Sequence, residues 1–515
     1  MSLVIAGRIA PMSAAAPVAG GESASFRGRV CIRDDGTIAA VQTTRQKLPP
    51  GFETARSVDV GTRLVVPGFI DLHSHLAYAP LPLWVEAGRT TPFQHHDIWP
   101  ARPTYAAEVT WPAYAFVTAS PAELLAYAEV RSLIGGTTSI QGSPPSNRPL
   151  DGWLVRNVED ETLGKTIPRT RVLSSTLTLD PQQLGKRADD MRAGSSFIYH
   201  CAEGRRGSMV AREYEGLRNA GCLQCNLVAI HTNALEAGAY GAWQQPGAVV
   251  WSPFSNLWLY GETTDVPSVL AQGIGVCIGS DWGPSGTRNV LGELKVAALV
   301  ARASGWGLSN FDLVKMVTAT PGDALARAWG RQVGRLQPDA LADLVVINTS
   351  SGRVDPFDTI VAATEMDIDL VMVGGKPLCG TPALMANAGA TGTSRLDVRH
   401  ERRALALTRF DTGAAWSFAD VLARMAEVRA DPKKEIEAAR RNAVAGVAAG
   451  GPPAFRLALD MPTGRVPVGG LPRDLGKIVV PPIQPIAHDA AFFDALVGRG
   501  FHGGLLDGLR TYYDV

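Results

Sequence analysis

The chain has 515 residues, and its 49 basic and 49 acidic side chains give a formal net charge of zero. This balance argues against nucleic acid or an anionic membrane surface as a partner, because both select for clustered positive charge. The length exceeds that of a usual single domain and predicts two or three structural units.

The cellular compartment is inferred from cysteine usage and from the first residues. Six cysteines are scattered along the chain, which is typical of reduced, buried thiols in an intracellular protein. Cys222 and Cys225 lack a second cysteine pair, so we interpret them as packing residues rather than half of a zinc site. Residues 1–8 lack the pattern of a signal peptide, and no apolar run is long enough to span a membrane. A cytoplasmic protein is therefore expected.

Short strands and turns are expected in residues 1–64 and again in residues 333–385. Asp34-Asp35-Gly36 is a hairpin turn between two of these strands. We interpret the two stretches as one small β-domain that is interrupted by the segment between them. The expected strands are residues 3–6, 29–32, 37–41, 343–347 and 370–373.

Residues 65–332 alternate apolar strands with helical patterns, which is typical of a parallel barrel. Seven strands can be placed, and the eighth is expected somewhere in residues 142–170. Ser309 and Asp312 form a capping box that predicts a helix running toward Trp329. The seven strands are residues 64–72, 137–140, 171–175, 196–200, 227–231, 249–252 and 276–281.

Two further segments lie outside this alternation. The long connection formed by residues 76–121 predicts a lid or binding loop, and we interpret His95-His96 as part of its surface rather than as metal ligands. Residues 386–515 are a C-terminal extension to which no chemistry is assigned. Residues 417–445 of this extension are expected to be helical. Its histidines, which are His400, His488 and His502, are interpreted as surface or packing residues.

Potential metal ligands recur at the ends of the expected barrel strands. His73 and His75 end the first strand, and residues two apart on a strand point the same way. His200 and His231 end two later strands, and Asp281 ends the last. A parallel barrel builds its active site from residues at the C-terminal ends of several strands. The pattern therefore predicts that these side chains meet at one metal site.

In this order, His73-x-His75, His200-x-x-Glu203, His231 and Ser280-Asp281 resemble the amidohydrolase superfamily of metal-dependent hydrolases. The resemblance covers about residues 1–385 and lies nearest the mononuclear branch with cytosine deaminase, guanine deaminase, imidazolonepropionase and triazine hydrolases. It implies an α/β fold with a (β/α)8 TIM-like barrel and a small β-sandwich domain built from segments on both sides of it. The expected domains are residues 1–64 and 333–385 for the sandwich, 65–332 for the barrel and 386–515 for the extension.

The donor set and the resemblance together assign roles to the site residues. His73, His75, His200 and Asp281 are expected to bind one divalent metal ion, for which zinc is favoured and iron stays open. Asp281 is also expected to accept a proton from the metal-activated water, and Glu203 to act as general acid. His231 is expected to hold the hydroxide or polarise the substrate.

One metal ion is favoured over two. Two-metal relatives use a carboxylated lysine at the end of the fourth strand, and the expected strand at residues 171–175 has no lysine. Lys165 and Lys186 lie on either side of it. Whether Gln141, Trp251, Asn256 and Trp282, near strand ends, line the substrate pocket or only pack is left open.

The favoured function is hydrolysis of a carbon–nitrogen bond, other than a peptide bond, in a small polar ring compound. Deamination and cyclic-amide opening both fit, and His200-x-x-Glu203 favours deamination because a ring nitrogen must be protonated before ammonia leaves. The alternatives are hydrolytic dechlorination, as in some triazine hydrolases, and a non-catalytic scaffold on the same fold. A small-molecule substrate is expected, and whether the chain forms a homo-oligomer stays open.

Overall fold

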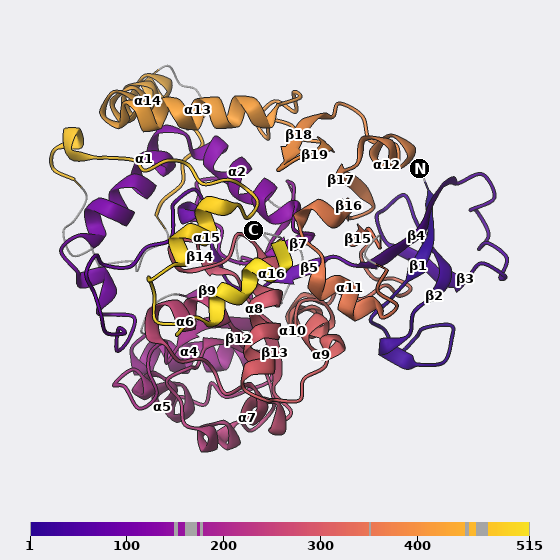
Figure 1. Ribbon diagram of the computed structural model, residues 1–515, viewed down its shortest axis with the longest axis horizontal. Coiled ribbons are helices and arrows are strands. Elements are labelled where there is room, and N and C mark those ends of the chain that lie inside the picture. Colours follow the sequence, from indigo (N-terminus) through magenta and orange to yellow (C-terminus); the bar gives the residue numbers. More distant parts are fainter. Residues whose placement is uncertain are drawn as a thin grey trace.

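The computed structural model describes residues 2–148, 153–159, 172–175, 179–349, 352–448, 453–459 and 472–513. The chain has a mixed α/β fold in which a parallel barrel is joined to a separate sheet. Figure 1 shows the barrel helices in the lower half of the view and the sheet, which begins at the N-terminus, at the right.

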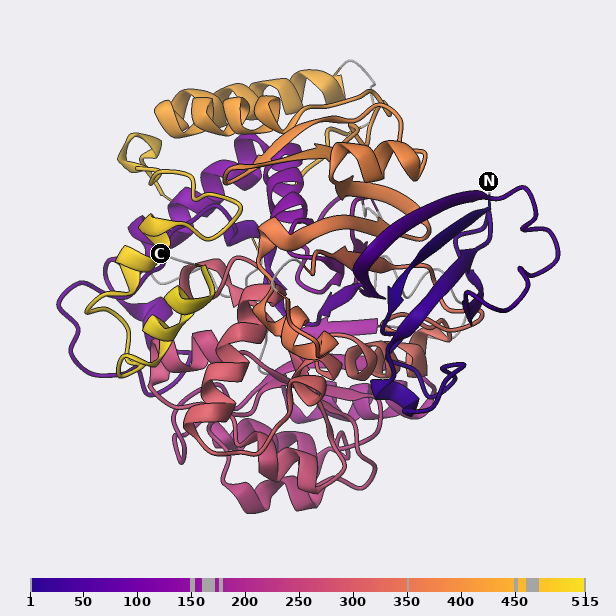
Figure 2. The same ribbon diagram turned by 45° about the vertical axis from the view of Figure 1, so that its right-hand side comes forward.

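Nine strands of the described chain form one continuous sheet in the order β18-β19-β17-β16-β15-β4-β1-β2-β3. Strands from before and after the barrel meet at its centre, where β15 runs antiparallel to β4 and Val345 lies opposite Val66. Figure 2 shows the indigo N-terminal strands beside the orange later ones. The strands are β1 (Leu3–Ile9), β2 (Phe26–Ile32), β3 (Ile38–Thr43), β4 (Arg56–Pro67), β15 (Leu344–Ile347), β16 (Ile368–Val373), β17 (Lys376–Gly380), β18 (Ser394–Val398) and β19 (Glu401–Leu405).

The apolar run of residues 64–72 forms two strands instead of the single one that was expected. β4 ends at Pro67 and belongs to the separate sheet, whereas β5 (Phe69–Asp71) is the first barrel strand. A Cβ atom on Gly68 would lie 2.1 Å from Oγ1 of Thr138 on the next barrel strand. The chain therefore passes its neighbour at a distance that only glycine allows, and it changes sheet there.

Eight parallel barrel strands are described. The one that could not be placed from the sequence is β8, which lies within residues 142–170 as expected. The barrel strands form two ladders, β5-β7-β8 and β9-β10-β11-β12-β13. The carbonyl groups of Met316 and Val317 accept hydrogen bonds from Ile278 and Ile70 and so link the last strand to the first. The strands after β5 are β7 (Thr137–Ile140), β8 (Arg156–Asn157), β9 (Val172–Ser175), β10 (Ser196–Cys201), β11 (Leu227–His231), β12 (Ala248–Trp251) and β13 (Gly275–Ile278).

Helices surround this barrel. The capping box of Ser309 and Asp312 starts a helix as predicted, but the helix ends at Lys315 and a second one begins at Ala319. The interruption falls at the two carbonyl groups that serve the barrel strands, so they cannot serve a continuous helix. The helices are α4 (Pro181–Arg192), α5 (Ala211–Asn219), α6 (Pro253–Tyr260), α7 (Val266–Ala271), α8 (Val290–Ala303), α9 (Asn310–Lys315), α10 (Ala319–Trp329) and α11 (Pro356–Ala362).

The long connection after the first barrel strand is largely ordered. It contains the short helix η3 (Trp99–Ala101), a π-helical turn at Ala106–Thr110 and α1 (Trp111–Ala119), and α2 (Pro121–Leu133) follows. Hydrogen bonds from Trp84 N to Pro284 O and from Phe93 N to Leu259 O attach it to the barrel. The segment is therefore a fixed cover over the barrel end.

The C-terminal residues pack on both units. The helices of this C-terminal part are α12 (Pro382–Asn387), α13 (Phe418–Ala430), α14 (Pro432–Ala448), α15 (Ala490–Leu496) and α16 (Arg510–Tyr513). In Figure 1, α13 and α14 lie along α1 and α2. Phe492 on α15 contacts the ring of Phe254 on α6, and Lys295 on α8 lies over the ring of Tyr513 on α16. Strands β18 and β19 extend the sheet beyond residue 385, so the expected extension contributes to that sheet.

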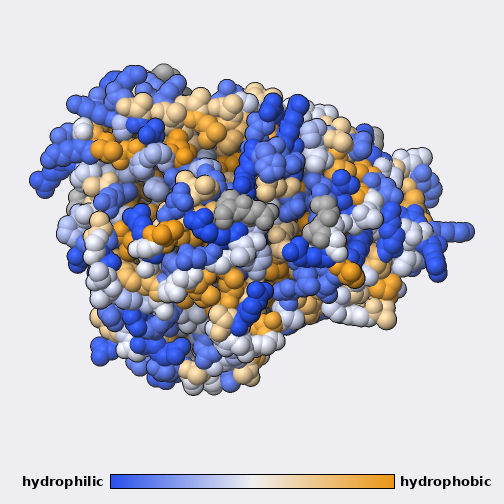
Figure 3. All heavy atoms as spheres, viewed as in Figure 1, coloured by the Kyte–Doolittle hydropathy of each residue, from blue (hydrophilic) through white to orange (hydrophobic). Residues whose placement is uncertain are grey.

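The face shown in Figure 3 mixes hydrophobic and hydrophilic residues in small groups. Among the described residues, no helix is both long and apolar enough to cross a bilayer.

Candidate active site

The predicted ligands meet at the C-terminal end of the barrel. A two-strand ladder joins β6 (Ser74–His75) to β14 (Asp281–Trp282), so the first and last ligand segments lie side by side. Nε2 of His73 lies 2.9 Å from Oδ1 of Asp281, and Nε2 of His75 lies 3.6 Å from the same atom. The ring centre of His200 is 4.5 Å from that of His73. The structure therefore brings all four predicted ligands together.

His231 joins the same cluster. Its Nε2 atom lies 3.8 Å from Oδ2 of Asp281 and 3.7 Å from Oε2 of Glu203. Potential ligand atoms lie within 4.8 Å of one another in two overlapping sets, His73 with His75 and Asp281, and His73 with His200 and His231. His73 belongs to both sets, so it lies at the centre of the arrangement.

The chemistry of these groups fits a divalent metal ion. Nε2 of His231 is buried and has no hydrogen-bond partner among the described residues, and the buried Nε2 of His73 faces Oδ1 of Asp281. Burial lowers the pKa of His231 to about 3 and that of His200 well below its usual value, so both rings are neutral, as metal binding requires. Burial alone would raise the pKa of Asp281, but the neighbouring histidines hold it well below its usual value. Neutral imidazoles around an ionised carboxylate are a suitable donor set.

Glu203 lies beside this cluster, directly after the end of β10. Its side chain is nearly buried, and burial raises its pKa to about 7. One carboxyl oxygen, Oε1, accepts a hydrogen bond of 2.6 Å from the hydroxyl of Tyr260, and the other faces His231. Glu203 is thus placed to hold a proton next to the histidine and aspartate cluster.

Left-handed backbone occurs at several strand ends of the site. His231 has φ 69°, Asp281 has φ 59° and Ala202, between His200 and Glu203, has φ 54°. Such conformations are costly for residues other than glycine and persist only where the surrounding structure imposes them. At these positions they redirect the chain as each strand ends. Sequence reasoning had no signal for them.

Asp71 is a buried site residue that sequence reasoning missed. Its Oδ1 atom accepts hydrogen bonds from the backbone N–H groups of His73 and Ser280, and its Oδ2 atom accepts one of 2.5 Å from the Ser280 hydroxyl. It therefore connects the first ligand strand to the last. An aspartate inside an apolar strand, two residues before a histidine, was the available signal.

Two amides near the strand ends orient the histidine rings. Oε1 of Gln141 is 3.5 Å from Nδ1 of His73, and Nδ2 of Asn256 is 3.2 Å from Nδ1 of His231. Groups that bind the far nitrogen of an imidazole fix its rotation and aim the other nitrogen at a ligand. Trp251 instead donates its indole N–H to Thr263.

An aromatic cluster lies next to Asp281. Trp282 stacks on Trp99 with ring centres 5.0 Å apart, and it also contacts Trp84, Tyr105 and Tyr78. Most of these rings come from residues 76–121. The predicted lid therefore contributes aromatic surface beside the candidate ligands.

The remaining candidates lie away from the ligand cluster or brace it. His96 bonds Glu213 at 2.8 Å, and although burial opposes this, Glu213 raises the pKa of His96 to about 9. Lys186 is exposed on α4, and Lys165 lies outside the described residues. Cys222 and Cys225 are free thiols.

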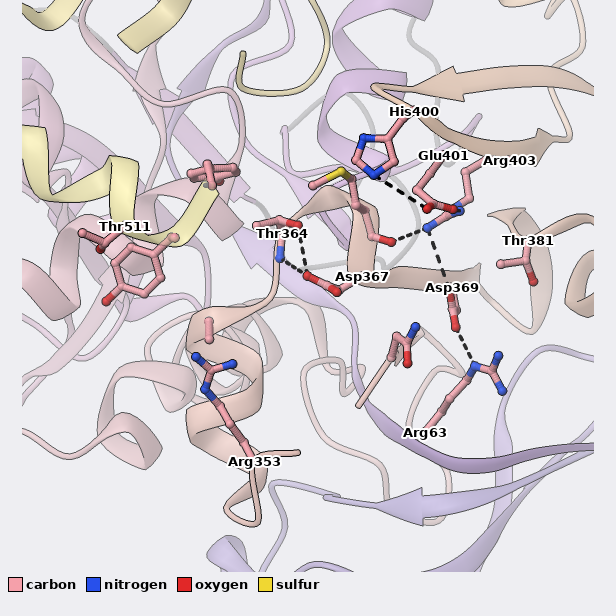
Figure 4. A pocket seen from close by; sticks show the side chains of 15 residues that line it. Arg63, Arg353, Thr364, Asp367, Asp369, Thr381, His400, Glu401, Arg403 and Thr511 are labelled. Carbon is pink, nitrogen blue, oxygen red and sulfur yellow. Dashed lines mark hydrogen bonds and ion pairs between the residues drawn. The ribbon is translucent and has the colours of Figure 1, made fainter. Parts of the chain in front are cut away.

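A cavity of about 580 Å³ lies elsewhere, between the sheet and the C-terminal helix. In Figure 4, Arg63 and Arg403 point toward Asp369, so much of the charge that lines this cavity is already paired. It contains none of the residues of the histidine and aspartate cluster.

The fold and the histidine and aspartate cluster define the class of metal-dependent barrel hydrolases, and comparisons with known proteins agree. The sequence model of the Amidohydrolase family matches residues 244–378. A 5-methylthioadenosine/S-adenosylhomocysteine deaminase of Syntrophomonas wolfei is 23% identical over 70% of this chain and 90% of its own length. A 5'-deoxyadenosine deaminase of Methanopyrus kandleri is 24% identical over 67% of this chain and 88% of its own length.

Solved structures show the same fold. An adenosine deaminase from Xanthomonas campestris with bound zinc matches with a TM-score of 0.54 and 16% identity, over 84% of this chain and 98% of that one. A mutant of the atrazine chlorohydrolase from Arthrobacter aurescens, complexed with zinc and atraton, matches with a TM-score of 0.59 and 15% identity, over 83% of this chain and 99% of that one. These matches agree with the resemblance to the amidohydrolase superfamily that the motifs indicated.

Proposed function

We propose that this protein is a metal-dependent deaminase that hydrolyses an exocyclic amino group from a purine-like ring. The observation that carries the proposal is the placement of Glu203 and His231, 3.7 Å apart, beside the histidine and aspartate cluster. Deamination requires a proton donor next to an activated water, and this pair lies where both are needed. The names of the relatives, which include deaminases of adenine nucleosides, support the same reaction.

In this proposal His73, His75, His200 and Asp281 hold one divalent ion, with zinc favoured. When bound, such an ion makes hydroxide available from water near neutral pH. Asp281 accepts the proton of the attacking water, because its carboxylate is held ionised by the neighbouring histidines and is free to act as a base. His231 holds the hydroxide or polarises the substrate.

Glu203 delivers a proton to the ring nitrogen beside that carbon. The burial that raises its pKa to about 7 makes its protonated form available near neutral pH. The proton accepted by Asp281 then passes to the leaving amine and the C–N bond breaks as ammonia departs. The hydroxyl proton of the collapsing intermediate returns to Glu203 as the new C=O bond forms. Trp282 and Trp99 offer flat apolar faces, which suits a planar heteroaromatic substrate.

Ammonia release from a defined substrate panel tests this function. The panel contains 5'-deoxyadenosine, 5-methylthioadenosine, S-adenosylhomocysteine, adenosine and guanine, with a cyclic amide as the ring-opening control. We expect ammonia from at least one aminopurine and no opening of the cyclic amide. Ring opening without ammonia release would overturn the proposed reaction.

Replacing Glu203 tests the proton donor. Glu203→Gln keeps the size and polarity of the side chain but cannot deliver a proton, so we expect turnover to fall about a hundredfold or more. Metal content should not change, because Glu203 is not a proposed ligand. Turnover near that of the wild type would remove Glu203 from the mechanism.

Metal analysis tests the ligand set. Purified protein is expected to contain about one zinc or iron ion per chain, as a catalytic site with an open position requires. The double variant His73→Ala, His75→Ala should lose the ion, while His400→Ala, on an exposed histidine, should retain it. Two tightly held ions per active chain would contradict the mononuclear assignment.

Hydrolytic dechlorination is a second candidate. An S-triazine hydrolase of Gordonia rubripertincta is 29% identical over 34% of this chain and 38% of its own length. Atrazine is therefore added to the panel with chloride release as the measurement. Chloride release together with inert aminopurines would favour this candidate.

A further inference from the structure

Tyr260 connects the proposed proton donor to the cover of the barrel. It ends α6 and is fully buried. Its hydroxyl donates a hydrogen bond of 2.6 Å to Oε1 of Glu203 and accepts one of 3.0 Å from the indole nitrogen of Trp99. Three side chains from distant parts of the sequence thus form one hydrogen-bonded chain.

The direction of these hydrogen bonds is set by the chemistry of the Trp99 indole, where they begin. An indole N–H can only donate, so the tyrosine oxygen must be the acceptor of the bond from Trp99. The single hydroxyl proton of Tyr260 is then free to point at Glu203. In this arrangement Tyr260 donates to Oε1 of Glu203, so Oε1 is the acceptor.

This direction determines where Glu203 can carry its own proton. A proton on Oε1 would face the hydroxyl proton of Tyr260, so the acid proton belongs on Oε2. That oxygen is the one 3.7 Å from Nε2 of His231, on the side of the candidate ligands. The hydrogen-bonded chain therefore presents the proton toward the place where the substrate would lie.

We propose that Tyr260 and Trp99 are positioning residues that keep the transferable proton of Glu203 on Oε2, facing the reacting ring. This inference rests on the proposed role of Glu203 as proton donor. It assigns a function to the cover formed by residues 76–121, because the indole of Trp99 both starts the chain and stacks on Trp282 beside Asp281.

The backbone near Glu203 is held separately from its side chain. Arg205 N donates to Gln94 O at 2.8 Å, and His96 N donates to Glu203 O at 3.1 Å. Glu213 bonds both the His96 ring and the backbone N–H of Ala202. Removing the hydroxyl of Tyr260 should therefore leave the turn in place and free only the carboxyl group.

Steady-state kinetics on the deaminated aminopurine tests the inference. Tyr260→Phe is expected to lower kcat about tenfold with KM within about twofold of the wild type, the size expected for one lost hydrogen bond to a carboxyl group. Trp99→Phe, which keeps an aromatic ring, is expected to lower kcat about threefold. Because Trp99 acts through Tyr260, the double variant should be no slower than Tyr260→Phe.

Matched controls exclude a general loss of structure. Tyr214→Phe and Trp153→Phe remove similar hydrogen bonds, to the backbone oxygens of Ala239 and Thr408, and should leave kcat unchanged. An equal loss in the controls, additive effects in the double variant, or a change confined to KM would overturn the inference.

Infrared spectroscopy separates this inference from the proposed function. The sample is acidified until the C=O stretch of protonated Glu203 appears. This band is assigned as the one that is absent from Glu203→Gln. Loss of a donor to Oε1 should move this band to higher frequency in Tyr260→Phe. A shifted band with a wild-type protein that deaminates nothing would reject the function alone, and an unmoved band would reject the positioning role.

Discussion

At the scale of single residues, Asp71 shows how one buried carboxylate organises the candidate site. It accepts three hydrogen bonds that join the backbone before His73 to Ser280, the neighbour of Asp281. Without it, two backbone N–H groups at the meeting point of the first and last ligand segments would lose their acceptor. The distance between those ligands therefore depends on a residue that is not itself expected to bind the ion.

Replacing Asp71 should weaken metal binding without removing any ligand. Asp71→Ala is expected to lower metal affinity about tenfold to a hundredfold, the usual effect of losing a group that supports the ligands. Competition with a chelator measures the affinity. Asp355→Ala, which removes a capping carboxylate at the start of α11, is the control and should leave it unchanged. Unaltered affinity in Asp71→Ala would show that the strands hold their spacing without this residue.

At the scale of elements, α2 carries a buried acid that ties it to the barrel. Oε2 of Glu129 accepts hydrogen bonds from the backbone N–H groups of Leu154 and Val155, just before β8, at 3.1 and 3.2 Å. Its Oε1 atom is buried without a hydrogen-bond partner among the described residues. Burial raises the pKa of Glu129 from 4.5 to about 7. The helix therefore holds a carboxyl group that prefers to be protonated.

This shift makes stability depend on pH. Because the folded-state pKa lies above the unfolded one, the folded chain retains a proton that the unfolded chain releases between pH 4.5 and about 7. The contribution of Glu129 to the free energy of unfolding therefore decreases as pH rises through this window, by about 3 kcal/mol. Glu129→Gln should match the wild type near pH 4.5 and be more stable at pH 8, as measured by urea unfolding. If the difference in stability between Glu129→Gln and the wild type were the same at both pH values, the raised pKa of Glu129 would be contradicted.

The barrel strands and their connections also show which features of an element depend on contacts with other parts of the chain. The strand ends that carry His200, His231 and Asp281 were expected from apolar runs alone. The division at Gly68 and the helix interruption at Met316 were not, because each depends on an approach to another part of the chain. The spacing of apolar residues and the secondary-structure propensity of each residue report local preference. They carry no information on which carbonyl groups will accept hydrogen bonds from a distant strand.

At the scale of the whole molecule, the C-terminal residues are joined to the loop that follows Asp281. His488 is fully buried, and its Nδ1 atom bonds Oε1 of Glu365 at 3.0 Å. The backbone N–H of Arg288, a few residues after Asp281, donates to Nε2 of the same ring at 3.3 Å. Burial alone would raise the pKa of Glu365, but His488 and Lys295 hold it at about 2. One imidazole thus links the tail, the sheet side and the barrel.

Removing this imidazole should destabilise the whole fold. His488→Ala leaves the buried carboxylate of Glu365 with fewer partners, and the free energy of unfolding is expected to fall by about 3 kcal/mol, as for a broken buried pair. Denaturant unfolding measures the loss. His400→Ala, at a side chain that is 71% exposed, should change stability by less than about 0.5 kcal/mol. Equal stabilities for the two variants would show that the tail only rests on the barrel.

The sequence by itself determined the resemblance to the superfamily, the barrel with its attached β-domain, and the residues that meet at the candidate site. It could do so because a parallel barrel places the ends of all its strands at one rim, so ligands there can be read from chain order. Only the tertiary structure decided that Asp71 joins two of those ends, that Tyr260 and Trp99 bond the Glu203 carboxyl, and that His488 reaches the loop after Asp281. Each of these is a contact between side chains and segments far apart in sequence, and its direction depends on packing that no local pattern encodes.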